Sequence, residues 1–77
     1  MNAEILKFAE RLELSMDGST VHNLVYSIAK ESSLNAVPLF RSLYQSLISK
    51  EYGPRFGKLV VAIGVGKVKE TLLSIYS

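Results

Sequence analysis

The residues best suited to chemistry lie between positions 50 and 58, where basic and aromatic side chains alternate around a proline. Basic side chains can pair with phosphates, aromatic rings can stack on an unpaired base, and the proline stiffens the backbone between them. The tract therefore predicts an RNA-binding surface. It would be formed by Lys50, Tyr52, Pro54, Arg55, Phe56 and Lys58.

A structural interpretation of the same tract has equal weight on the residues alone. Tyr52 and Phe56 could be core residues, and Gly53-Pro54 could simply turn the chain, because a residue before proline is disfavoured in a helix.

The sequence contains few residues that could act in catalysis. No cysteine is present, and the only histidine, His22, has no serine or threonine nucleophile organised around it. Glu10 and Glu13 lie on the polar face of a predicted helix, where solvated carboxylates are not tuned for acid–base catalysis. We expect no catalytic residue, no metal site and a surface role for His22.

Length and composition limit the architecture. The 77 residues are 48% hydrophobic and 21% charged, which is typical of one small globular domain over residues 1–77. The longest apolar run, Leu59 to Ile63, is too short to span a bilayer, which needs about 20 residues. Together with the absence of cysteine, this predicts a soluble cytoplasmic protein without a membrane partner.

The modest net charge of +2 is unevenly distributed. Residues 1–40 hold three basic and five acidic side chains, a net −2, whereas residues 41–77 hold six basic and two acidic side chains, a net +4. A compact basic surface is a common partner of a phosphate backbone. The alternative is a solvated face with ordinary lysines.

Hydrophobic periodicity predicts the elements that position these residues. Apolar side chains recur at helical spacing, so we expect an all-α fold, a small bundle of about five helices. Ser19 or Thr20 is expected to cap the second helix, Asn35 the third, and Gly64 is expected to end the fourth in a left-handed conformation. The short run 59–63 could also be a strand, but no partner strand is evident. The expected helices cover about residues 3–14, 21–32, 36–49, 59–63 and 66–76.

Two motifs in the second half resemble a known family. Phe40-Arg41-Ser42-Leu43-Tyr44 is followed by Lys50-Glu51-Tyr52-Gly53-Pro54-Arg55-Phe56-Gly57. This order resembles the C-terminal end of class I lysyl-tRNA synthetases, in which a helix with the pattern F-x-x-(I/L)-Y precedes a K-E-x-G-P-R-x-G loop. The resemblance is strongest over residues 39–64, and a weaker one extends to glutamyl-tRNA synthetases.

The resemblance implies an α-helical anticodon-binding domain that recognises the anticodon stem-loop of tRNA-Lys. The parent enzyme would be a lysine–tRNA ligase whose separate catalytic domain binds ATP, so no cofactor is expected in this chain. Contacts in the related glutamyl enzymes imply RNA-binding roles for Arg41, Pro54, Arg55 and Phe56. The rival hypothesis is a helical interaction module, stand-alone or architectural, that binds no nucleic acid.

Overall fold

The computed structural model describes residues 2–77, and this part of the chain folds into five α-helices without a β-strand. The expected small all-α bundle is therefore confirmed. None of the helices within residues 2–77 has the length and apolarity required to cross a membrane. The helices are α1 (Asn2–Arg11), α2 (Gly18–Glu31), α3 (Ala36–Ile48), α4 (Phe56–Ile63) and α5 (Val65–Tyr76).

Two helix ends differ from the expectation because of side chains that capture backbone groups. The expected second-helix caps, Ser19 and Thr20, are wrong: Asp17 is the N-cap, and its Oδ1 accepts a hydrogen bond of 2.8 Å from the Thr20 amide. Ser19 and Thr20 already lie in the first turn of α2. Helix α1 ends at Arg11 instead of near residue 14. The Lys69 Nζ donates to the carbonyl of Glu10, in the last turn of α1, and to that of Leu12, just beyond it.

The remaining helix boundaries are closer to the expectation. Asn35 caps α3 through a 3.2 Å hydrogen bond from the Val37 amide, as expected. The segment 59–63 is helical as expected, but α4 begins three residues earlier, at Phe56. Gly64 has a φ of 108° and a ψ of 123°, so its φ is positive but its conformation is not the expected left-handed helical one. A glycine is suited to this position, because other residues rarely adopt such a φ.

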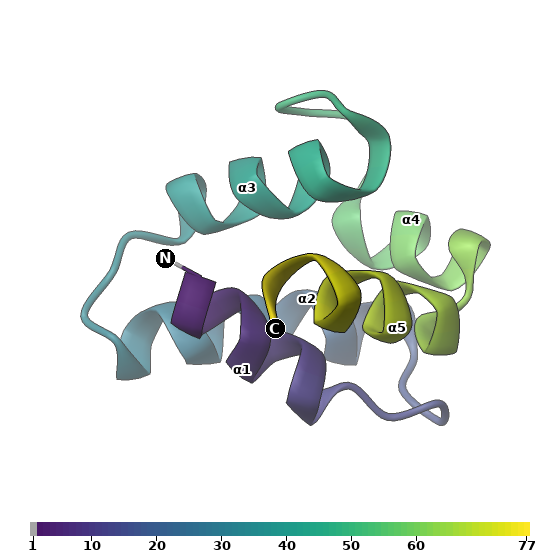
Figure 1. Cartoon of the computed structure of the whole chain (residues 1–77), viewed down its shortest axis with the longest axis horizontal. Helices are drawn as coiled ribbons and strands as arrows, with labels where there is room; N and C mark the ends of the chain where they lie inside the picture. The colour runs from purple at the N-terminus through teal and green to yellow at the C-terminus, as the bar shows by residue number, and fades with distance from the viewer. Residues whose placement is uncertain (1) are drawn as a thin grey trace.

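The core lies where all five helices meet. Helices α1 and α5 lie against each other, and α2 packs against α4 and α3 (Figure 1). Phe8 and Phe56 are the largest fully buried side chains, with ring centroids 5.8 Å apart. The other buried core residues come from every helix and from residue 12: Ile5, Ala9, Leu12, Val21, Val25, Ile28, Ala29, Leu39, Leu43, Val60, Val65, Val68 and Leu72.

The contact between Lys69 and the end of α1 gives a first prediction. The ammonium group of Lys69 satisfies the Glu10 and Leu12 carbonyls at 3.3 and 3.0 Å, and a cation is favoured at the negative end of a helix. We expect Lys69→Met to keep the aliphatic part of the side chain but to lower the free energy of unfolding by about 1 kcal/mol. Urea unfolding followed by circular dichroism measures this change.

Lys30→Met provides the control for the Lys69 variant. It removes the same charge from the last turn of α2, at an exposed position. If the two variants unfold at the same urea concentration, Lys69 does not stabilise the end of α1.

Candidate nucleic-acid interface

The loop between α3 and α4, residues 49–55, is held against α3 at both ends. Ser49 adopts a left-handed conformation with a φ of 59°, and its amide donates to the Gln45 carbonyl at 3.0 Å. The Tyr44 hydroxyl donates to the Pro54 carbonyl. A Cβ atom at Gly53 would lie 2.9 Å from the Ile48 side chain, so this part of the loop passes close to α3. The loop is therefore fixed in shape by the helix before it.

Two of the expected RNA-binding residues, Arg55 and Lys58, line a groove between the first turns of α2 and α4. The groove has a volume of about 560 Å³. Its other lining residues come from the start of α2 and the first turn of α4, and we call it the α2–α4 groove. It is lined by Asp17, Gly18, Ser19, His22, Asn23, Arg55, Gly57 and Lys58.

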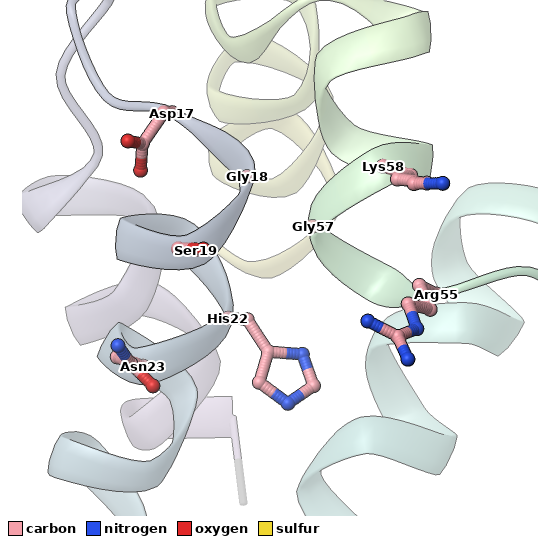
Figure 2. Close-up of a pocket in the computed structure, with 8 residues that line it drawn as sticks. All are labelled: Asp17, Gly18, Ser19, His22, Asn23, Arg55, Gly57 and Lys58. Atoms are coloured by element: carbon pink, nitrogen blue, oxygen red, sulfur yellow. The ribbon is translucent and has the colours of Figure 1, made fainter.

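The orientation of the side chains divides the α2–α4 groove into two sides. Figure 2 shows the His22 ring and the Arg55 guanidinium turned toward the space between the two helices. The Asp17 carboxylate points away from Arg55, and the Lys58 side chain projects away from His22 (Figure 2). The Arg55 side of the groove can therefore present positive charge to an anion without a carboxylate directly facing it.

Backbone packing brings the starts of α2 and α4 together at this groove. Gly18 and Gly57 are in direct backbone contact: a Cβ atom at Gly18 would lie 3.2 Å from the Gly57 carbonyl carbon. Helix N-termini carry partial positive charge from unpaired amides and the helix dipole. The Asp17 carboxylate caps α2 and offsets the positive end of that helix. The start of α4 has no side-chain cap, so its dipole adds to the positive potential of Arg55 and Lys58.

The other expected residues do not join the α2–α4 groove. Arg41 lies in a second groove of about 360 Å³, with Pro38, Ser42, Gln45, Glu51 and Tyr76. Lys50 and Tyr52 are exposed on the loop and line neither groove. The structure thus separates Arg41 from Arg55 and Lys58, although all three side chains are exposed.

Phe56, one of the two aromatic residues predicted to stack on a base, is turned into the core in this structure. Phe56 is only 1% exposed, and its ring contacts Phe8, Phe40 and Tyr44 at centroid distances of 5.8, 5.5 and 5.6 Å. An aromatic ring enclosed by three others has no face left for a base. Tyr52, in contrast, is 80% exposed, so the loop keeps one aromatic side chain that can be reached from solvent.

His22 also lines the α2–α4 groove, although the sequence analysis assigned it no functional role. The expected surface location is correct, because its side chain is partly exposed in the first half of α2. Its ring also contacts Tyr26 and Phe40, at centroid distances of 5.3 and 5.1 Å. The four-residue spacing of His22 and Tyr26 was a local signal for the first contact. The second contact depends on how α3 packs on α2 and has no local signal.

The carboxylate of Asp17 makes the stability of the α2 start depend on pH. The hydrogen bond from the Thr20 amide lowers the pKa of Asp17 below its ordinary value. A lowered folded-state pKa adds stability that is complete above the unfolded pKa of about 3.9 and is lost as the pH falls through the folded pKa. The part of the native chain's advantage over Asp17→Ala that depends on the charged carboxylate should therefore shrink as the pH is lowered from about 5 toward the folded-state pKa.

Thermal unfolding of three chains over this pH range tests the prediction for Asp17. Asp17→Asn keeps a side-chain acceptor but does not titrate, so its advantage over Asp17→Ala should stay constant with pH. If the native chain and Asp17→Asn lose stability in parallel, the Asp17 carboxylate is not responsible.

Comparison with known proteins identifies relatives of the chain. It is 35% identical to the lysine–tRNA ligase of Archaeoglobus fulgidus over 65 residues. These residues make up 84% of this chain and 13% of that protein. The chain is 38% identical over 58 residues to the lysine–tRNA ligase of Methanocaldococcus jannaschii, 74% of this chain and 11% of that protein. The lysine–tRNA ligase of Borreliella burgdorferi is 25% identical over 67 residues, 87% of this chain and 13% of that protein.

These matches confirm the resemblance to lysyl-tRNA synthetases that the sequence motifs indicate. The chain spans only about an eighth of the length of these relatives. No protein-family model matches the chain. No solved structure matches it.

Proposed function

Because the chain is related to a segment of the lysine–tRNA ligases, we propose that it is a tRNA-binding domain that recognises the anticodon stem-loop of tRNA-Lys. The observation that carries the proposal is the meeting of Arg55 and Lys58 with the start of α4, which no side chain caps, in one groove. Phosphates are bound by such arrangements of basic side chains and helix N-termini.

The exposed part of the loop extends the proposed interface. Lys50 and Pro54 are exposed beside Tyr52, and the contact between Tyr44 and Pro54 holds the loop against α3. In this proposal Lys50, Arg55 and Lys58 pair with phosphates, Tyr52 stacks on an unpaired base, and Arg41 bonds a base edge or a phosphate from the second groove.

A domain of this kind serves a larger enzyme. The proposed partner is the catalytic domain of a class I lysine–tRNA ligase, which binds ATP and performs the ligation in the cytoplasm. The relatives are about eight to ten times as long as the matched segment, since the match covers 10–13% of their length. Catalysis is accordingly assigned to that domain and not to this chain.

Binding of a labelled RNA stem-loop with a lysine anticodon tests the proposal. We expect Arg55→Ala and Lys58→Ala each to weaken binding about tenfold and to reduce the salt slope by about one unit. Fluorescence anisotropy over a salt series measures both quantities. Lys30→Ala is the matched control, because it removes a positive charge from the opposite end of α2.

Three results would contradict the proposal. A stem-loop with an altered anticodon could bind as tightly as the lysine stem-loop, Arg55→Ala could bind as tightly as Lys30→Ala, or the affinity could be insensitive to salt. Insensitivity to salt is the behaviour expected of the rival function, a helical module that docks on protein.

A further inference from the structure

Three aromatic side chains form a surface cluster at one edge of the α2–α4 groove. His22 and Tyr26 come from α2 and Phe40 comes from α3, and we call them the aromatic patch. Each ring contacts the other two, with centroid distances of 5.1 Å between His22 and Phe40, 5.3 Å between His22 and Tyr26, and 5.4 Å between Tyr26 and Phe40. The three rings therefore form one connected unit.

The aromatic patch contacts the core on one side and is exposed to solvent on the other. Phe40 contacts the buried ring of Phe56 at 5.5 Å, which connects the patch to the core. Tyr26 is 51% exposed although it is a large aromatic residue. An aromatic ring held in place by its neighbours can stack on a ligand with little loss of side-chain entropy. The patch thus has the properties of a preformed stacking surface.

His22 connects the aromatic patch to the positive charge of the α2–α4 groove. Its ring belongs to the patch and also lines the groove, where it faces Arg55 (Figure 2). A ligand that contacts both must combine a flat apolar face with a nearby negative charge. A nucleotide has this combination, and stacking on aromatic rings beside a basic groove is how proteins bind single-stranded nucleic acid.

We infer that the aromatic patch stacks an unpaired base of the RNA whose phosphate is bound by Arg55 in the α2–α4 groove. Tyr26 provides the exposed face, His22 lies between base and phosphate, and Phe40 holds both rings in place. The inference rests on the proposed RNA-binding function and adds a base-binding site on α2, outside the loop 49–55. An apolar protein surface would match Tyr26 but would bring no negative charge to Arg55.

Substitutions at Tyr26 test the stacking role in the complete chain. With the labelled lysine stem-loop as probe, we expect Tyr26→Ala to weaken binding about tenfold. Tyr26→Phe should bind like the native chain, because the ring is kept. Tyr26→Leu keeps an apolar side chain without a π-face, and we expect it to bind like Tyr26→Ala. Thermal melts should show all three variants folded at the assay temperature, since the residue is half-exposed.

The possible outcomes separate the aromatic patch from anticodon recognition. If Arg55→Ala weakens binding and Tyr26→Ala does not, the stacking role is overturned, while the groove and the proposed function stand. If Tyr26→Leu binds as tightly as Tyr26→Phe, stacking is also overturned. If Tyr26→Ala weakens binding of the lysine stem-loop and of an altered stem-loop equally, and the native chain binds the two with equal affinity, the stacking site is supported and anticodon recognition is contradicted.

Discussion

Gly57→Ala is expected to leave the domain largely unfolded under conditions in which the native chain is folded. The added methyl group would overlap the Gly18 backbone, with the Gly18 carbonyl carbon only 2.6 Å and its Cα 2.9 Å from the new atom. Relief requires α2 and α4 to move apart, because backbone atoms cannot rotate away. Overpacking of this kind costs about 3 kcal/mol or more, and a domain this small has only about 3–5 kcal/mol of stability.

Gly66→Ala is a closely matched control for Gly57→Ala. Gly57 and Gly66 are each the second residue of a helix, in α4 and α5. A Cβ atom at Gly66 would lie 2.8 Å from the end of the Leu14 side chain, which is 80% exposed and can rotate away. We expect Gly66→Ala to change the free energy of unfolding by less than about 1 kcal/mol, with helix propensity favouring alanine. Urea unfolding of both variants, followed by circular dichroism, makes the comparison.

Similar unfolding midpoints for Gly57→Ala and Gly66→Ala would show that α2 and α4 do not touch at Gly18. Such a result would also remove the basis of the α2–α4 groove, since the two helix starts would no longer lie together. The stability measurement therefore tests the geometry of the proposed RNA site without any RNA.

The number and type of the helices could be predicted because periodicity is a local property. Val21, Val25, Ile28 and Ala29 follow helical spacing, and all four are buried. Helix ends were less predictable because tertiary contacts contribute to them. The end of α1 is bonded by Lys69, which lies 57 residues beyond Leu12. The cap of α2 had a local signal in Asp17, which competes with Ser19 and Thr20 as an acceptor.

The candidate site was predictable in composition but not in arrangement. The basic and aromatic residues of the loop could be named from the sequence, and most of them are exposed. Which aromatic side chain turns inward depends on partners from other helices, and Phe56 finds Phe8 on α1 and Phe40 on α3. The contribution of α2 to the groove required the contact between Gly18 and Gly57, which no local pattern indicates.

The burial of Phe56 also explains how a short loop can be kept ready for binding. Arg55 precedes a side chain that is anchored in the core, and the Pro54 carbonyl accepts from Tyr44. The C-terminal end of the loop is thereby attached to the bundle on both sides of Arg55, at Pro54 and at Phe56, while Lys50 and Tyr52 remain exposed. Such anchoring reduces the entropy that binding would otherwise cost.

Phe56→Ala is expected to destabilise the domain strongly, by about 3–5 kcal/mol, because it leaves a cavity among three aromatic rings. The unfolding midpoint in urea measures this loss. Tyr52→Ala should change the midpoint little, because Tyr52 is 80% exposed. The losses of unfolding free energy in Phe56→Ala and Tyr52→Ala should thus differ by an amount close to the whole stability of the domain.

Phe56→Leu separates the structural role of Phe56 from a role in RNA contact. Leucine fills much of the same space, so the loss of stability should be smaller and the variant should remain folded at low temperature. At that temperature we expect Phe56→Leu to bind the lysine stem-loop like the native chain and Tyr52→Leu to bind about tenfold more weakly. A folded Phe56→Leu variant with the same tenfold loss would instead mean that the ring leaves the core to meet the RNA. Equal affinities for Tyr52→Leu and the native chain would leave the aromatic patch on α2 as the stacking surface.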